Sequence, residues 1–321
     1  MIVGQDRAVA RFVEAKGSGS FHHAWLLAGP RGVGKARFAR EAATRILAEA
    51  AGPAVREPGL DTPPDHPMAR LVEANSHPDF RWIERELNDK GDALKRNISA
   101  KQIRKLNELF GSTPSMSPWR VVVIDSADDL EREGANALLK MLEEPPPNCL
   151  FLLVAHAPGR LLPTIRSRCS RLDFQRLDDD AMTSILGRAL PDPDPAAVAR
   201  LVGLSGGSAG RALDYAALDL GQAESDALAI LRDGDPTNAR RSKLAQGLAG
   251  KAAAERYTAF LQLVPSLIAR EARTLDGPRQ IRALDAYTSA RETAALAHRL
   301  SLDPAATVFQ LGTILAGVGG R

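Results

Sequence analysis

The stretch Ala24-Trp-Leu-Leu-Ala-Gly-Pro-Arg-Gly-Val-Gly-Lys35 decides the fold of this chain. Its first five residues are apolar and predict a short buried strand. A glycine-rich loop follows from Gly29 to Lys35, and the residues from Lys35 to Ala50 have the composition of a helix. A strand, a glycine loop and a helix in this order form the local structure that a phosphate-binding loop requires.

The loop matches the pattern G-x-x-x-x-G-K. In such a loop, backbone N–H groups and the start of the following helix surround phosphate oxygens, while the lysine reaches the terminal phosphates. We therefore take four residues as candidates for binding a nucleotide: Gly29, Gly32, Gly34 and Lys35.

Two parts of a hydrolysing site are missing from the sequence. Ala36 follows the loop lysine and lacks the Ser or Thr hydroxyl that ligates Mg²⁺. The apolar run Trp119–Asp125 predicts a central strand that ends in a candidate acidic residue, Asp125, but the next residue is Ser126 instead of a water-orienting glutamate. Loss of a positioned general base typically lowers a rate by ~10²–10⁴-fold. We therefore expect a degenerate ATP site that does not turn over.

Outward from the loop, predicted strands alternate with predicted helices, which favours a parallel α/β sheet with right-handed crossovers. Further strands are predicted at Phe80–Glu84, Leu150–Ala155 and Arg171–Phe174. The strand pattern stops after about Leu177, and the remainder has helical periodicity. We predict an α/β domain over 1–176, a small helical domain over 177–220 and a helical bundle over 221–321.

The composition is that of a globular protein, with 44% apolar and 25% charged residues. The net charge of +3 is compatible with contact to phosphate backbones but too small to predict it. The chain has neither a signal-peptide pattern nor the ~18 consecutive apolar residues of a membrane span. We expect a cytoplasmic protein without membrane contact, whose Cys149 and Cys169 are buried as small hydrophobic residues.

Three motifs resemble those of clamp-loader subunits of the AAA+ superfamily: His22–Lys35, Asn136–Pro146 and Ser167-Arg168-Cys169. With the two missing catalytic parts, the chain is most similar to the delta-prime subunits of bacterial DNA polymerase III. The resemblance covers about residues 1–215. It implies a P-loop AAA+ domain over 1–176, a helical lid over 177–220 and a collar domain for oligomerisation over 221–321.

The resemblance also implies roles for two arginines. Arg168 would act in trans as an arginine finger, pointing across a subunit interface at the γ-phosphate of a neighbouring ATPase, because its planar fork stays charged and stabilises phosphate charge. The alternative is a surface residue in a basic cluster with Arg160, Arg166 and Arg171. Arg211 resembles the sensor-two arginine of a lid that closes over nucleotide, with an exposed position in a first helical turn as the alternative.

No cofactor is expected to be required, although weak binding of ATP or ADP stays open because the loop itself is intact. Delta-prime relatives commonly carry a four-cysteine zinc module before a His-Pro-Asp segment. This chain has His77-Pro-Asp79 but no cysteine between residues 51 and 80. Since His66 and His77 with nearby carboxylates match no structural zinc pattern, we predict no zinc and no other metal.

The partners that the resemblance implies are tau/gamma-type ATPase subunits and a delta-type subunit in a ring. The sliding clamp would be engaged indirectly, and primer-template DNA would lie inside the ring. Five basic residues accompany a predicted helix capped by Ser99 and form either a solvated helix face or a DNA-backbone contact. They are Lys95, Arg96, Lys101, Arg104 and Lys105.

The rival function is an active AAA+ motor, either a tau/gamma-like ATPase or a branch-migration helicase. The intact loop Gly29–Lys35 favours it, whereas Ala36 and Ser126 count against it. The position near His156, where active relatives carry a Thr or Asn as sensor one, also counts against it.

Overall fold

In the computed structural model, which describes residues 1–19, 21–91 and 94–319, the chain divides into two compact units. The first comprises Met1–Asp178, and the second begins at Asp179. The first unit contains every named strand, whereas the named elements of the second are helical.

The five strands of the first unit form one parallel sheet in the order β2-β3-β4-β1-β5. The central strands β3, β4 and β1 are buried along their whole length, as their continuous apolar sequences predict. Their bounds are β1 Ala24–Ala28, β2 Phe80–Ile83, β3 Arg120–Ile124, β4 Cys149–Ala155 and β5 Ser170–Asp173. The predicted α/β fold with a parallel sheet is confirmed.

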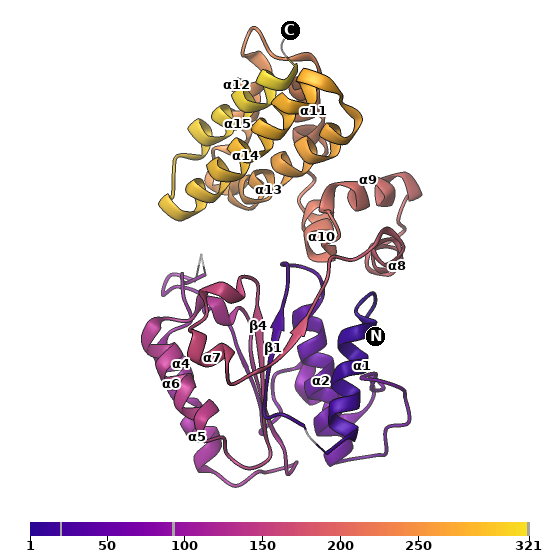
Figure 1. Cartoon of the computed structure of the whole chain (residues 1–321), viewed down its shortest axis with the longest axis vertical. Helices are drawn as coiled ribbons and strands as arrows, with labels where there is room; N and C mark the ends of the chain where they lie inside the picture. The colour runs from indigo at the N-terminus through magenta and orange to yellow at the C-terminus, as the bar shows by residue number, and fades with distance from the viewer. Residues whose placement is uncertain (20, 92–93, 320–321) are drawn as a thin grey trace. The chain divides into compact units, whose positions relative to one another are not determined.

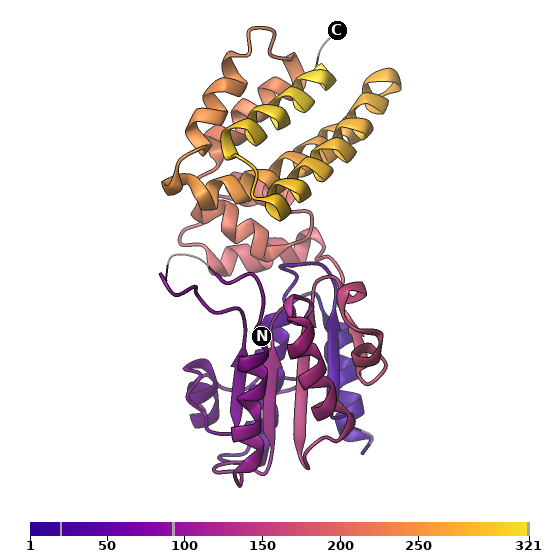
Figure 2. The same ribbon diagram turned by 90° about the vertical axis from the view of Figure 1, so that its left-hand side faces the viewer.

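Helices cover both faces of this sheet (Figures 1 and 2). Alternate strand residues face opposite layers, so that Val121 and Val123 belong to one core and Val122 and Ile124 to the other. The first layer contains α1 Asp6–Gly17, α2 Lys35–Ala50 and α3 Pro67–Glu73, and the second contains α4 Ala100–Arg104, α5 Leu106–Gly111, α6 Arg132–Glu143 and α7 Pro163–Arg166. Short 3-10 turns follow β3 and β4, at Ala127–Asp129 and Pro158–Arg160.

The second unit is built of helices packed along apolar stripes. On α13, Phe260, Val264, Leu267 and Ile268 are buried at helical spacing. The helices are α8 Asp179–Ala189, α9 Pro195–Ser205, α10 Ala209–Ala217, α11 Gly221–Asp233, α12 Ala239–Leu248, α13 Ala254–Glu271, α14 Gly277–Leu300 and α15 Pro304–Gly319. Short 3-10 turns lie at Lys251–Ala253 and Ala272–Thr274. The division into a lid and a collar at residue 220 stays a prediction, because both parts fall in this one unit.

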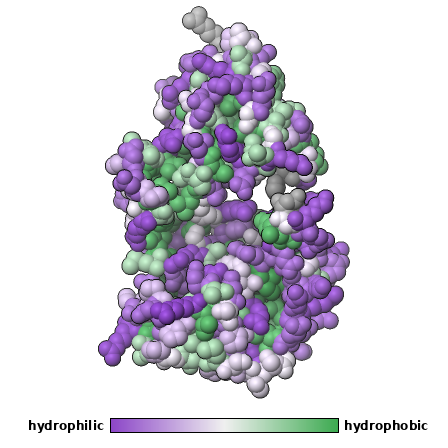
Figure 3. Space-filling view, turned by 180° about the vertical axis from the view of Figure 1, so that it is seen from behind, coloured by the Kyte–Doolittle hydropathy of each residue, from purple (hydrophilic) through white to green (hydrophobic). Residues whose placement is uncertain are grey.

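The surface mixes polar and apolar residues on the face seen in Figure 3. Within residues 1–19, 21–91 and 94–319, no helix is both long and apolar enough to span a bilayer. Cys149 is buried as predicted, and Cys169 is partly buried against the core under α6 and α7.

Candidate functional site

The phosphate loop lies between the end of β1 and the start of α2, as the sequence predicts. Gly29, Gly32 and Gly34 have φ angles of 154°, 76° and 100°, which residues with side chains rarely adopt. At Gly29 a Cβ atom would lie 2.3 Å from the carbonyl oxygen of Phe174, the residue after β5. Glycine is therefore required here both by conformation and by the close approach of the neighbouring strand.

Lys35 is folded back into its own loop. Its side chain is only 2% exposed, and Nζ donates hydrogen bonds to the carbonyl oxygens of Gly29, at 2.7 Å, and Pro30. Burial lowers the pKa of this ammonium to about 8, against the opposing attraction of Asp128 and Asp125. The lysine uses two of its three N–H donors on the loop itself, so it would have to exchange these carbonyls for phosphate oxygens to hold a nucleotide.

Gln5 braces the loop from the N-terminal segment, a contact that sequence reasoning missed. Its buried side-chain amide donates to the carbonyl of Val33, at 3.1 Å, and to that of Gln175, at 2.9 Å. The backbone N–H of Gln175 returns a bond of 3.3 Å to Oε1. Because these partners are 28 and 170 residues away, no local pattern around Gln5 could have indicated them.

The acidic half of the site begins where β3 ends. Asp125 is half-buried, and its backbone N–H donates to the carbonyl of Ile83 on β2 at 2.8 Å. Burial, and then the charge of Glu84, raise the pKa of the Asp125 carboxyl, while Lys35 acts in the opposite direction. Asp125 thus lies within electrostatic range of the loop lysine, and its part in holding a nucleotide stays a prediction.

Beyond Asp125, the groups that replace a catalytic glutamate are neutral or already bonded. Ser126 has a left-handed φ of 63°, and its Oγ lies 3.2 Å from Nε2 of His156. Burial, and then the charge of Lys35, lower the pKa of His156 to about 4, so its ring is neutral at physiological pH. The nearby Asp128 carboxylate accepts the backbone N–H groups of His156, at 3.0 Å, and Ala157, at 2.9 Å, so it caps the end of β4.

The Ser-Arg-Cys tripeptide follows α7 and places a partly buried residue beside one that reaches the surface. Cys169 packs against the core, and burial raises the pKa of its thiol to about 12. Ser167 donates from Oγ to the carbonyl of Thr164 at 3.1 Å. Arg168 between them keeps a side chain that is 36% exposed, with Nη2 2.8 Å from Glu143 Oε1 at the end of α6. The predicted finger residue therefore reaches the surface but carries an ion-pair partner within its own chain.

Arg211 lies in the second unit, on α10, where Ser208 caps the helix. Its Nη1 lies 3.4 Å from the carbonyl of Ser205 and 3.5 Å from Oγ of Ser266 on α13. These contacts join α10 to α13 within that unit. Its predicted contact with nucleotide stays a prediction.

Hydrogen bonds hold the two histidines that the sequence analysis considered as zinc ligands. His66 accepts the backbone N–H of Met68 on Nδ1 and contacts the carbonyl of Pro53 through Nε2, while Nδ1 of His77 accepts the N–H of Asp79. Across the described ranges, no group of three or more His, Cys, Asp or Glu side chains has the arrangement of a metal site. Both histidines therefore have structural partners, whereas the cofactor predictions stay predictions.

Asp79, which sequence reasoning treated only as part of a motif, anchors the loop before β3. Its buried carboxylate accepts the backbone N–H groups of Ser115, Met116 and Ser117 at 2.8, 2.8 and 3.0 Å. Burial alone would raise the pKa of this carboxyl, but the three donors hold it below its usual value.

The five basic residues near the predicted Ser99 helix differ in exposure and in their acidic neighbours. Lys95 lies 3.7 Å from Glu86 and 3.5 Å from Asp89, so acidic neighbours partly neutralise its charge. The exposed basic residues at α4 and next to it are Arg96, Lys101, Arg104 and Lys105. Ser99 caps this helix as predicted, but the helix breaks at Lys105 into α4 and α5. Contact with DNA stays a prediction.

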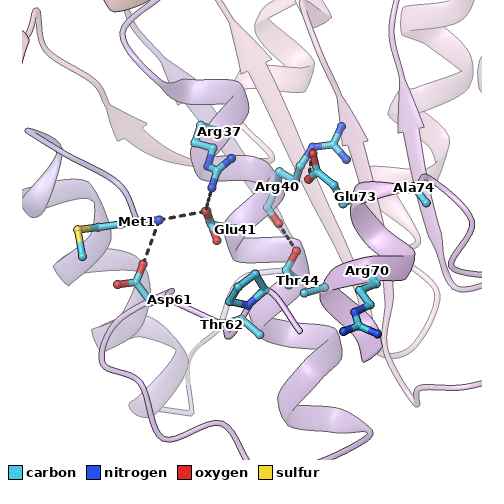
Figure 4. Close-up of a pocket in the computed structure, with 12 residues that line it drawn as sticks. Met1, Arg37, Arg40, Glu41, Thr44, Asp61, Thr62, Arg70, Glu73 and Ala74 are labelled. Carbon is cyan, nitrogen blue, oxygen red and sulfur yellow. Dashed lines mark hydrogen bonds and ion pairs between the residues drawn. The ribbon is translucent and has the colours of Figure 1, made fainter. Parts of the chain in front are cut away.

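A separate cavity of about 680 Å³ lies against α2 and α3 (Figure 4). Four of its charged groups form ion pairs: the Met1 ammonium lies 3.3 Å from Glu41 and 3.5 Å from Asp61, and Arg37 lies 2.6 Å from Glu41. The residues described as lining it do not include the loop from Gly29 to Lys35. The cavity is therefore distinct from the phosphate site.

Comparison with known proteins shows that the chain matches the model of a known protein family. The family model described as "DNA polymerase III, delta subunit" matches residues 4–178. The delta' subunit of DNA polymerase III from Pseudomonas aeruginosa is 36% identical over 186 residues, which are 58% of this chain and 53% of that protein. The gamma/tau subunit from Mycobacterium bovis is 32% identical over 187 residues, 58% of this chain and 30% of its own length. The matched region is thus about half of the delta' relative and less than a third of the gamma/tau one.

Among solved structures, a gamma subunit-related protein of DNA polymerase III from Thermotoga maritima has a TM-score of 0.45 at 17% identity, over 97% of this chain and 98% of that one. The RuvB Holliday junction branch migration motor of the same organism has a TM-score of 0.43 at 16% identity, over 98% of this chain and 88% of that one.

Proposed function

The chain belongs to the DNA polymerase III delta subunit family, and we propose that it is a delta-prime-like clamp-loader subunit that supplies Arg168 to a neighbour's ATP site instead of hydrolysing ATP itself. The observation that carries this proposal is the contrast between the chain's own candidate ATP site and the exposed Arg168. Its own site lacks the reactive groups, whereas Arg168 reaches the surface.

The chain's own site supports a holding role at most. Ala36 offers no metal-binding oxygen, and the residues after Asp125 present a hydroxyl, a neutral imidazole and a carboxylate that already caps two backbone N–H groups. None of these matches a carboxylate free to orient water. Lys35, bonded to its own loop, further weakens binding of ATP or ADP.

Arg168 supports the acting role. The partly buried Cys169 and the capping Ser167 hold the backbone, so the arginine between them projects from a fixed point. An arginine donated in trans stabilises transition-state charge and contributes ~10³–10⁵ in rate in related NTPases. Tau/gamma-type ATPase subunits would receive it, in a ring completed by a delta-type subunit, with the sliding clamp and primer-template DNA as further partners.

The test is Arg168→Ala in an assembly reconstituted with the tau/gamma-type, delta-type and clamp partners. DNA-stimulated ATP hydrolysis and clamp loading should collapse by at least about 10³-fold, while co-elution of the subunits is retained. Arg166→Ala is the matched control, because Arg166 is an exposed arginine only two residues away, at the end of α7. Turnover unchanged by Arg168→Ala would refute the proposal.

An active ATPase is the second candidate, favoured by the intact loop and by the likeness to gamma/tau subunits. It requires the purified chain to hydrolyse ATP in a manner abolished by Lys35→Ala. Hydrolysis that is equal in both proteins would exclude it.

A further inference from the structure

Arg168 is held from two sides within its own chain. Its Nη2 lies 2.8 Å from Oε1 of Glu143, and its Nη1 donates to the carbonyl of Thr164 at 3.1 Å. We propose that Glu143 is a positioning residue, which orients the Arg168 guanidinium toward the nucleotide of the neighbouring subunit. This inference rests on the proposed function and deepens it, because it concerns how the same arginine is prepared.

Both backbones that carry this pair are fixed by the core. Glu143 is the last residue of α6, directly after Leu142, which is buried. On the other side, the backbone N–H of Arg168 donates to the carbonyl of Ile165 at 3.1 Å, and Cys169 packs into the same core. Since α6 and α7 are neighbours in this layer (Figure 1), the pair joins two anchored helix ends and only the side chains have freedom.

The contacts leave the guanidinium with donors to spare. An arginine has five N–H donors in a planar fork. The bonds to Glu143 and Thr164, with a longer 3.5 Å contact to Ser167 Oγ, occupy three of them within the described residues. At least two donors therefore stay available for phosphate oxygens while the plane of the group is already set.

The strength of the ion pair indicates that Glu143 orients Arg168 and does not inhibit it. The Arg168 side chain is 36% exposed and that of Glu143 42%, and an ion pair this exposed shifts an equilibrium by about fivefold at most. That is too little to withhold an arginine whose action contributes ~10³–10⁵ in rate. It is enough to reduce the rotamer freedom that the side chain would otherwise lose when it meets a phosphate.

The test compares Glu143→Ala and Glu143→Lys with Glu144→Ala and Glu144→Lys in the reconstituted assembly. Glu144 is the adjacent exposed glutamate and serves as the matched control. Glu143→Ala should lower the kcat of DNA-stimulated ATP hydrolysis by about two- to fivefold at unchanged KM. Glu143→Lys should lower it further, because it places a like charge beside Arg168, and both Glu144 variants should match the unmodified assembly.

Arg168→Ala in the same series separates the two proposals. If it abolishes hydrolysis while the Glu143 variants equal the Glu144 variants or turn over faster, the positioning role is overturned and the finger stands. If Arg168→Ala leaves hydrolysis intact, both are overturned.

Nitrogen NMR of the guanidinium in the isolated chain adds a readout that does not depend on turnover. Restricted rotation of the Arg168 Nη groups should be lost in Glu143→Ala and kept in Glu144→Ala, and equal spectra in the two variants would also overturn the positioning role.

Discussion

Ser126 Oγ lies 3.2 Å from Nε2 of His156, joining the ends of β3 and β4 directly after the strand aspartate. The pair places a neutral contact where a hydrolysing site needs a carboxylate. The protonation state of His156 therefore reports on the surroundings of this pair.

We predict that His156 does not titrate between pH 6 and 8, because burial and Lys35 lower the pKa of its ring to about 4. Its imidazole resonances should therefore stay constant over that range. Ser126→Asp should raise this pKa by adding an opposite charge, and Ser126→Ala, which removes the contact without adding charge, is the control. A ring that titrates near pH 6.5 in the unmodified protein would contradict the prediction.

The same shift has a consequence for stability. The unfolded chain takes up a proton on His156 near pH 6.5, whereas the folded chain does so only near pH 4. The unfolded state binds more protons between these values, so the contribution of His156 to the free energy of unfolding falls as the pH drops through this window.

Asp79→Asn should lower the free energy of unfolding by about 2–3 kcal/mol, since the three N–H groups of residues 115–117 lose a charged acceptor. Urea denaturation at pH 7 measures this, with Asp65→Asn at an exposed position as the control. Because the folded pKa of Asp79 is lowered, its stabilisation is present above its unfolded pKa and is lost as the pH falls through the folded one. Equal stability of the two variants at pH 7 would show that the carboxylate charge is unimportant.

Gln5→Ala should cost about 2 kcal/mol of stability, because it leaves the carbonyls of Val33 and Gln175 without their side-chain donor. Amide hydrogen exchange should accelerate selectively in the loop 29–35, which loses its brace. Gln310→Ala, at an exposed position on α15, should change neither quantity. Unchanged exchange in the loop of Gln5→Ala would argue against bracing.

Two glycine-to-alanine substitutions should change the stability of the chain in opposite directions. Gly29→Ala should destabilise the chain by more than about 2 kcal/mol, because its Cβ would meet the carbonyl oxygen of Phe174 at 2.3 Å in a left-handed backbone. Gly187→Ala on α8, where a Cβ meets nothing within 4 Å, should stabilise by about 0.5–1 kcal/mol. Thermal unfolding distinguishes the two, and a shift of the same sign in both would contradict the explanation.

The parts of the site that were predictable lie close together in the chain. The strand, loop and helix around Gly29 are contiguous, so apolar periodicity and glycine spacing were enough to place them. Asp125 was recognisable because it directly follows a nearly continuous apolar strand. The exposure of Arg168 beside the partly buried Cys169 agrees with the division between polar and apolar residues in that tripeptide.

The parts that were missed join distant segments. Ser126 meets His156 across 30 residues, Asp79 meets Ser117 across 38, and Gln5 meets Gln175 across 170. In each pair a polar side chain is satisfied by a group whose position depends on the order of strands in the sheet. A polar residue in isolation carries no signal that names such a partner.

The amino-acid sequence alone establishes that no Ser or Thr hydroxyl follows the loop Gly29–Lys35 and that no glutamate follows Asp125, because Ala36 and Ser126 occupy those positions in any fold. Tertiary structure decided what the remaining groups do. In the folded chain Lys35 donates to its own loop, and Asp128 accepts backbone N–H groups at the end of β4. Arg168 forms an ion pair with Glu143. The physical reason is that composition limits which atoms exist, while hydrogen bonds and ion pairs depend on distances that only the packed sheet and helices define.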